Sequence, residues 1–309
     1  MNLLLTRMKS FLFRALAVVL LQALSFLSFA GNDGCPCCNC PCASNPNAAG
    51  KQIRILAIGN SFSQDAVEQY LSELLMEAGY DPIVANCYIG GCTLKRHWEN
   101  EISEDESKRC SNSYRKLVRG VKTKTDKVSI EYILRDEPWD YVIFQQGAGL
   151  YGIVDSHYPY LDNFLTYVAG ILTPGYKTGY QMNWAFPADC SDTARFGRYD
   201  NDQMKMYEAC RDAAFILQER SHLDIIIPTG TAIQNGRTSS LGDTFNRDWG
   251  HLDLNHGRYT ASCTWLEAIT GINVTTLTYA PDSLTPEVAA ICRQAAHNAV
   301  QSPKQITSF

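Results

Sequence analysis

The sequence predicts an α/β fold in which a mainly parallel, five-stranded sheet lies between two layers of helices. Two observations point to it. From residue 51 onward, short apolar runs alternate with longer segments of helical periodicity, which is typical of a parallel sheet covered on both faces. The chain has 309 residues, 45% of them hydrophobic, which is enough to bury a large core. We therefore expect one three-layer α/β/α domain over 51–309.

The expected strands are short apolar runs at 53–58, 82–88, 141–145, 178–184 and 224–228. The expected helices are 65–78, 113–120, 161–172, 203–220, 255–269 and 286–300. The last helix has a clear start, because Thr285 can cap its first turn and Pro286 suits the first helical position. The charged stretch 95–127 mixes both signs, so we expect a solvated insertion outside the sheet.

The first 30 residues have the features of a secretory signal peptide. Three basic residues near the start precede an apolar run over 15–27, and the small residues Ser28 and Ala30 follow with the usual cleavage spacing. The apolar run is short for a spanning helix, and an uncleaved anchor is the alternative. We therefore expect a protein that is secreted, periplasmic or displayed on the cell surface, without an integral membrane span in the mature chain.

The 12 cysteines fall into two groups, with five of them in the run 35–42. This run lies in a segment, 31–50, whose composition predicts a Cys-rich tail or linker. A local disulfide knot is favoured over a metal clip or a surface attachment, because no second Cys/His cluster has zinc-like spacing. Since five and the remaining seven are both odd numbers, full oxidation requires an odd number of bridges between tail and domain, or an intermolecular bridge. No metal site is predicted.

The charge of the chain excludes one class of partner. The formal net charge is −5, whereas binding to nucleic acid depends on Lys and Arg side chains that neutralise phosphates. We therefore expect no nucleic-acid partner.

The first strand leads directly into Gly59-Asn60-Ser61-Phe62-Ser63 and then into a helical segment. A serine at this turn lies at the carboxyl edge of the sheet, beside free N–H groups of the helix start, where developing negative charge is stabilised. Ser61 is therefore the candidate nucleophile. The alternative is that Ser61 or Ser63 only caps the helix.

Of the six histidines, His251 is the best candidate for the base. It lies in a loop before a helix, and Asp248, three residues earlier, can accept its ring N–H and fix its tautomer. Asp253 and His256 repeat this spacing. His256, however, falls in the first helical turn after a possible Asn255 cap, where it would point along the helix. We therefore prefer Asp248 and His251.

These residues resemble the SGNH or GDSL-type hydrolases. Residues 59–63 look like the nucleophile block of that family, and 248–251, followed by Gly257, look like its Asp-x-x-His block. The layout from 53 to about 300 is similar to a secreted bacterial branch of SGNH-like proteins associated with polysaccharide use. The resemblance implies a flavodoxin-like sandwich and a serine hydrolase without a cofactor. It also implies an oxyanion hole made by Ser61 and by Gly91, which follows the second strand.

The sequence departs from the family pattern at two places. Asn60 stands where the GDSL block has aspartate, which keeps the shape of the turn but removes a charge. The oxyanion asparagine is absent, and the resemblance assigns its role to the amide of Gln146. The neighbouring Gln145 would point to the opposite face if the strand continues, so it remains the alternative donor.

The expected reaction is removal of an acetyl or other acyl group from a carbohydrate or small-molecule ester. Ser61 attacks the carbonyl, His251 takes its proton and Asp248 holds the imidazole. His97, Trp98 and Trp249 are candidate substrate contacts, although a structural hydrogen bond is equally open for His97. Two alternatives remain: a secreted carbohydrate-binding or surface-interaction protein without turnover, and phosphate or flavin binding by the first loop.

Overall fold

The computed structural model describes residues 50–309, which belong to one compact unit. The predicted signal peptide, and the predicted Cys-rich tail up to residue 49, lie outside the described residues and stay predictions. Among residues 50–309, no helix combines the length and the apolar character that crossing a bilayer requires.

A seven-stranded sheet with the strand order β4-β3-β2-β1-β5-β6-β7 forms the centre of the molecule. Five of its strands are parallel: β1 (Lys51–Gly59), β2 (Tyr80–Tyr88), β5 (Tyr141–Phe144), β6 (Lys177–Gln181) and β7 (Ile225–Ile227). They correspond to the five predicted strands. The order β2-β1-β5-β6-β7 is that of a doubly wound, flavodoxin-like sheet. The predicted fold class is therefore confirmed, with two strands more than expected.

The two additional strands come from the charged segment, and the helix predicted at 113–120 is wrong. β3 (Asn112–Val118) pairs antiparallel with β2, and β4 (Val121–Val128) pairs antiparallel with β3. Tyr114 and Leu117 are buried against the domain, whereas β4 is exposed along almost its whole length. The mixed charges are thus typical of a solvated edge hairpin, where charged side chains discourage pairing with another sheet.

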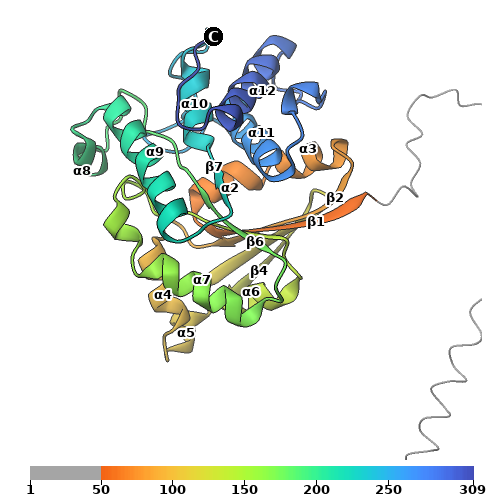
Figure 1. Cartoon of the computed structure of the whole chain (residues 1–309), viewed down its shortest axis with the longest axis vertical. Helices are drawn as coiled ribbons and strands as arrows, with labels where there is room; N and C mark the ends of the chain where they lie inside the picture. Colours follow the sequence, from red (N-terminus) through yellow and green to blue (C-terminus); the bar gives the residue numbers. More distant parts are fainter. Residues whose placement is uncertain (1–49) are drawn as a thin grey trace, which may run out of the picture. The chain divides into compact units, whose positions relative to one another are not determined.

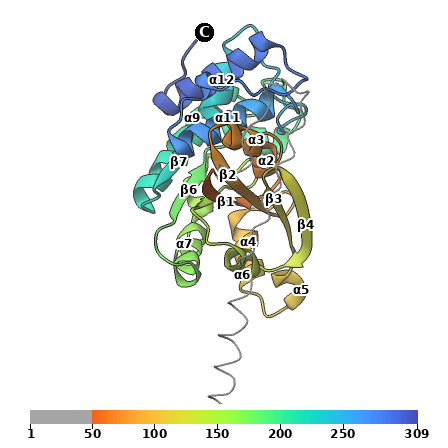
Figure 2. The ribbon, with the colours of Figure 1, turned by 90° about the vertical axis from the view of Figure 1, so that its right-hand side faces the viewer.

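Helices cover both faces of the sheet and give the predicted three layers. Figure 1 shows one group of helices on one face: α2 (Ser61–Val67), α3 (Leu71–Glu77), α10 (Thr229–Arg237), α11 (His256–Thr270) and α12 (Pro286–Gln301). The other face carries α4 (Leu94–Glu101), α6 (Ile130–Asp136) and α7 (Tyr160–Ile171), and α9 (Gln203–Arg220) packs on β6 and β7 (Figure 2). The short helices α5 (Glu106–Arg109) and α8 (Thr193–Phe196) lie in connections.

The predicted helix 65–78 is two helices, and the first of them begins earlier than expected. α2 starts at Ser61 because the side chain of Asn60 accepts a hydrogen bond from the Phe62 N–H and caps the helix. α3 begins at Leu71. The serine of the predicted nucleophile turn is thus the first residue of a helix.

The register of the central strands gathers three loops at one edge of the sheet. β1 lies between β2 and β5, and its last residue, Gly59, is aligned with Tyr88 at the end of β2. Ile58 is aligned with Phe144 at the end of β5. Because the carboxyl ends of parallel strands lie together, the loops that follow β1, β2 and β5 meet there.

Candidate active site

The turn that carries Ser61 is fixed by Asn60, which is fully buried. Asn60 Oδ1 accepts a hydrogen bond from the Phe62 N–H (2.9 Å), and Asn60 Nδ2 donates to the carbonyl of Cys92 (2.8 Å). The second bond ties the turn after β1 to the loop after β2. An ionised aspartate could not donate it. The change from the family's aspartate to Asn60 therefore has a structural reason.

Ser61, His251 and Asp248 form one continuous chain of hydrogen bonds. Ser61 Oγ lies 2.8 Å from His251 Nε2. On the other side of the ring, His251 Nδ1 lies 2.8 Å from Asp248 Oδ2 and 3.1 Å from Oδ1. These distances are those of a nucleophile, its base and the group that orients the base. The structure thus brings together the three residues that the sequence predicts for catalysis.

Asp248 is held in its ionised form by the loop that carries it. Its Oδ1 also accepts the backbone N–H groups of Gly250 (2.9 Å) and His251 (2.7 Å). Burial raises the pKa of Asp248, but these bonds and the one from the His251 ring outweigh it and hold the pKa below its ordinary value. An ionised Asp248 accepts the Nδ1–H of His251, which leaves Nε2 free to accept the serine proton.

Aromatic rings hold the imidazole of His251 in place. The Phe62 ring stacks on it, with centroids 5.4 Å apart and planes 17° apart. Trp249 meets the imidazole at an angle of 60° and a distance of 5.6 Å. The Trp184 ring nitrogen also donates to the carbonyl of Gly250, the residue before His251 (2.7 Å). Trp249 is only half-buried, so this predicted substrate contact does border the base.

The backbone N–H groups of Ser61 and Gly91 are the predicted oxyanion donors. Gly91, in the exposed turn after β2, has a φ of +61°, a conformation that suits glycine. Within residues 50–309, no acceptor is found for the Gly91 N–H. The Ser61 N–H belongs to the first turn of α2, whose N–H groups have no partner within the helix. Ser61 and Gly91 therefore remain the candidate oxyanion donors.

Gln146 has different partners from those that the sequence predicts. Its Nε2 donates to the Ser156 carbonyl (2.9 Å), and its Oε1 accepts the N–H groups of Leu94 (2.9 Å) and Gly147 (2.8 Å). These contacts contradict the predicted oxyanion role of Gln146. The amide instead joins the loop after β5 to the start of α4, and it is fully buried.

The alternative donor, Gln145, lies on the opposite face of the sheet, as the alternation of a strand requires. A Cβ atom on Gly59 would lie 2.6 Å from Gln145 Cγ and 2.7 Å from Ser63 Oγ. Gln145 therefore packs between the end of β1 and α2, which explains the glycine at position 59. The Gln145 side chain accepts from Gln181 (3.3 Å). The two glutamines thus occupy opposite faces, each covered by a helix.

Two predicted substrate contacts are wrong. His97 is 1% exposed, and its Nε2 donates to the Gly59 carbonyl (2.8 Å). Burial lowers the pKa of His97 to about 4, so the ring is neutral. Trp98 packs edge-on against Phe164 (5.3 Å) and Tyr167 (5.9 Å) of α7. Both side chains therefore position α4 rather than face a ligand.

Asp65 is not among the site residues predicted from the sequence. This buried residue of α2 binds the backbone of Leu252 (2.8 Å) and two arginines, Arg247 and Arg258. The sequence pattern could have indicated it. Phe62 and Ala66, four residues apart, mark the buried face of the helix, and Asp65 is adjacent to that face. An acidic residue on a buried helix face requires compensating partners.

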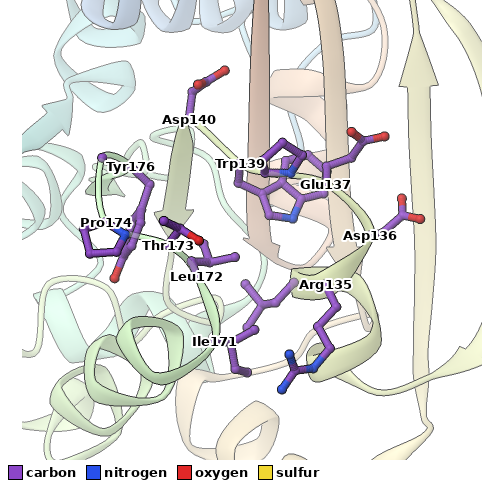
Figure 3. Close-up of a pocket in the computed structure, with 13 residues that line it drawn as sticks. Arg135, Asp136, Glu137, Trp139, Asp140, Ile171, Leu172, Thr173, Pro174 and Tyr176 are labelled. Atoms are coloured by element: carbon purple, nitrogen blue, oxygen red, sulfur yellow. The ribbon is translucent and has the colours of Figure 1, made fainter. Parts of the chain in front are cut away.

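One pocket of the domain lies away from Ser61, and another borders Asp248. A pocket of about 600 Å³ opens at the amino ends of β5 and β6, where Trp139, Asp140 and Tyr176 line it (Figure 3). Because Ser61 follows the carboxyl end of β1, this pocket is at the opposite edge of the sheet. A smaller pocket of about 300 Å³ lies beside Asp248 and Trp249. Among the described residues, no group of three or more His, Cys, Asp or Glu side chains could hold a metal ion.

The comparisons with known proteins agree with this fold. The family model DUF4886, a domain of unknown function, matches residues 54–299. A crystal structure of a DUF4886 family protein from Bacteroides uniformis is 43% identical, with a TM-score of 0.80 over 84% of this chain and 98% of that chain. No curated protein matches the chain.

Two further solved structures are similar at lower scores. A putative SGNH hydrolase from Slackia heliotrinireducens is 19% identical, with a TM-score of 0.48 over 71% of this chain and 100% of that chain. An acetyl xylan esterase is 14% identical, with a TM-score of 0.43 over 69% of this chain and 98% of that chain. SGNH hydrolases are also the superfamily that the sequence resembles. Because both TM-scores are below 0.5, a function for this chain has to come from the geometry of its site.

Proposed function

We propose that this chain, which belongs to the DUF4886 family, is a serine hydrolase that cleaves carboxylic esters, with an acylated carbohydrate as its substrate. One observation carries the proposal. Ser61 Oγ, the His251 ring and the Asp248 carboxylate are linked by hydrogen bonds of 2.8 Å on each side of the ring. A base that is oriented by a carboxylate and faces a hydroxyl has the geometry of nucleophilic acyl transfer.

In the first half of the reaction, Ser61 Oγ attacks the ester carbonyl carbon while His251 Nε2 takes the hydroxyl proton. Asp248 stabilises the imidazolium that forms. The tetrahedral intermediate collapses, the bond to the alcohol oxygen breaks, and His251 gives its proton to the leaving alcohol. In the second half, His251 takes a proton from water, the water oxygen attacks the acyl-serine, and the acid leaves as Ser61 regains its proton.

The oxyanion of each intermediate is bound by the backbone N–H groups of Ser61 and Gly91. Gln146 is not part of this hole, because its amide binds Ser156. Loss of one such donor costs on the order of 100-fold in kcat in a well-studied serine protease. We therefore expect a slow enzyme on small esters, unless the substrate itself supplies a further donor.

Two features favour a carbohydrate as the alcohol. The predicted signal peptide would export the chain to where glycans are met. The half-buried Trp249 ring borders His251, and a flat aromatic face can stack on the apolar face of a sugar ring.

The test is hydrolysis of p-nitrophenyl acetate and of acetylated glycans by the purified protein. Ser61→Ala is expected to lower kcat/KM by at least about 1,000-fold, because it removes the nucleophile. Ser63→Ala is the matched control. Ser63 lies on the same helix, but its hydroxyl binds Asn60 O (2.8 Å) and Asn86 Oδ1 (2.9 Å) and does not contact His251.

Absence of any Ser61-dependent turnover on both substrate classes would reject the hydrolase. The alternative, carbohydrate binding without turnover, makes a different prediction. Glycan binding would then survive Ser61→Ala unchanged in a protein that hydrolyses neither substrate.

A further inference from the structure

We propose that Asp65 is a positioning residue, which holds the segment Arg247–Leu252 against the helix of the nucleophile and so sets the distance between Ser61 and His251. This inference rests on the proposed function. Asp65 is one helical turn after Ser61 on α2, and its side chain is 1% exposed. It does not touch the reacting groups and acts on them through the backbone.

The carboxylate of Asp65 holds both ends of the Arg247–Leu252 segment. Its Oδ2 accepts the backbone N–H of Leu252, the residue after His251, at 2.8 Å. Arg247, the residue before Asp248, places Nη1 3.2 Å from each of the two carboxylate oxygens. One side chain therefore fixes the residues that flank Asp248 and His251.

A second arginine completes the charge balance of this buried group. Arg258 on α11 donates to Asp65 Oδ1 from Nε (2.9 Å) and from Nη2 (2.6 Å). Arg258 also binds Gln69 Oε1 (2.6 Å), close to the end of α2. A buried carboxylate is costly unless it is paired and its oxygens are hydrogen-bonded, and two guanidinium groups and one N–H meet that requirement here.

Three residues of α2 contact the Arg247–Leu252 segment. Ser61 meets the Nε2 atom of His251, Phe62 stacks on its ring, and Asp65 binds the backbone behind it. Ser61 and His251 are 190 residues apart in the chain. The distance between the hydroxyl and the imidazole therefore depends on contacts between α2 and the Arg247–Leu252 segment. A misplacement of 1 Å in a catalytic group can cost about 100-fold in rate.

The test compares Asp65→Ala and Asp65→Asn with a matched control, Glu68→Gln. Glu68 follows α2 directly, and its buried carboxylate binds Asn86 (2.7 Å) and two basic side chains, Arg115 and Lys122. It has no contact with Arg247–Leu252 in the described structure. All three substitutions therefore disturb a buried carboxylate next to two cations. Only the two Asp65 substitutions also disturb the Arg247–Leu252 segment.

We expect Asp65→Ala to lower kcat about 100-fold and Asp65→Asn about 10-fold, with KM changed less than about twofold, because the carboxylate is buried away from substrate. Asp65→Asn keeps the volume and one acceptor oxygen for the Leu252 N–H, so it provides a folded variant if Asp65→Ala does not fold. Glu68→Gln should keep kcat within about threefold of the unsubstituted protein.

Hydrogen-exchange mass spectrometry supplies a readout that does not need activity. Peptides covering 247–252 should exchange faster in Asp65→Asn than in the unsubstituted protein. Their exchange rate in Glu68→Gln should be the same as in the unsubstituted protein. Equal losses of kcat in the Asp65 and Glu68 variants, or unchanged exchange in Asp65→Asn, would overturn the positioning role. If the unsubstituted protein hydrolyses no ester, the proposed function fails, and the exchange data still decide whether Asp65 holds the segment.

Discussion

The molecule contains two Asp-x-x-His pairs, Asp248–His251 and Asp253–His256, only five residues apart. The carboxylate of each pair lies close to Nδ1 of its histidine, at 2.8 Å in the first pair and 2.9 Å in the second. Each carboxylate also accepts the backbone N–H of the same histidine, at 2.7 Å and 3.0 Å. At the level of local structure the two pairs are nearly identical.

The two Asp-x-x-His pairs differ in the group that faces Nε2 of the histidine. His251 Nε2 faces the hydroxyl of Ser61, which can donate a hydrogen bond. His256 Nε2 lies 2.9 Å from the carbonyl oxygen of Thr244, which can only accept, and 3.1 Å from the Thr244 hydroxyl. A carbonyl has no proton to give, and the Thr244 hydroxyl already donates to the Leu241 carbonyl (3.0 Å). His256 therefore faces no free hydroxyl that it could activate. The group opposite Nε2, and not the spacing of the pair, therefore decides which histidine can act as a base.

The largest expected difference between the two pairs is in activity. His251→Gln should lower kcat/KM by about 10,000-fold, whereas His256→Gln should change it less than about threefold, because only the first removes a base. Ester hydrolysis by the two purified variants measures the difference. Similar losses in both would show that the second pair also takes part in the chemistry.

A smaller loss of kcat is expected when Asp248 is changed, and almost none when Asp253 is changed. In Asp248→Asn the amide can donate to Nδ1, which places the ring proton on Nε2, where it blocks transfer from Ser61. We expect a loss of about 1,000-fold in kcat at neutral pH. Asp253→Asn should leave kcat within about threefold, since its histidine faces a carbonyl. Steady-state kinetics at pH 7 tests both, and an active Asp248→Asn would remove Asp248 from the mechanism.

A third histidine, His97, affects the stability of the protein rather than its activity. Nε2 of His97 also faces a carbonyl, that of Gly59, and burial lowers the pKa of His97 from 6.5 to about 4. Between these values the unfolded chain binds a proton that the folded chain excludes, so stability falls as the pH drops from about 6.5 to about 4. The loss is on the order of 3 kcal/mol for one such group.

His97→Gln should remove part of that loss, because a glutamine amide can donate to the same carbonyl and does not titrate. Urea unfolding at pH 7 and pH 4.5 measures it. Some pH dependence should remain, since burial also lowers the pKa of His157 to about 4. An unchanged difference between the two pH values would mean that the His97 ring is protonated in the folded protein.

The smallest effect concerns Asp253. Burial raises its pKa, but hydrogen bonds from the His256 ring and the Asn255 N–H outweigh this and lower the pKa of Asp253 from 3.8 to about 2. Its stabilising contribution is therefore present above about pH 4 and lost as the pH falls through 2. We expect Asp253→Asn to cost about 1 kcal/mol at pH 7 and almost nothing near pH 2, after allowance for solvent screening. Urea unfolding at both pH values tests this, and a constant difference would contradict it.

The parallel strands could be predicted because each buried strand is a short, nearly continuous apolar run, as 53–58 and 141–145 show. The hairpin of β3 and β4 could not, since its strands expose charged side chains at the sheet edge. Its pairing depends on hydrogen bonds to β2, which is more than 20 residues away along the chain. A segment of mixed charge has the same pattern whether it is a loop or a solvated strand.

The sequence alone determined the elements and residue pairs that local geometry fixes. A serine after a buried strand stands at the sheet edge, and an aspartate three residues before a histidine can reach its ring. The tertiary structure alone decided which partner each polar group meets. It placed Ser61 opposite His251 rather than a carbonyl, engaged Gln146 with Ser156, buried His97, packed Trp98 against α7, and brought Asp65 to both ends of the Arg247–Leu252 segment. The physical reason is that hydrogen bonds act over about 3 Å, and such distances between segments far apart in the chain are set by the packing of the whole domain.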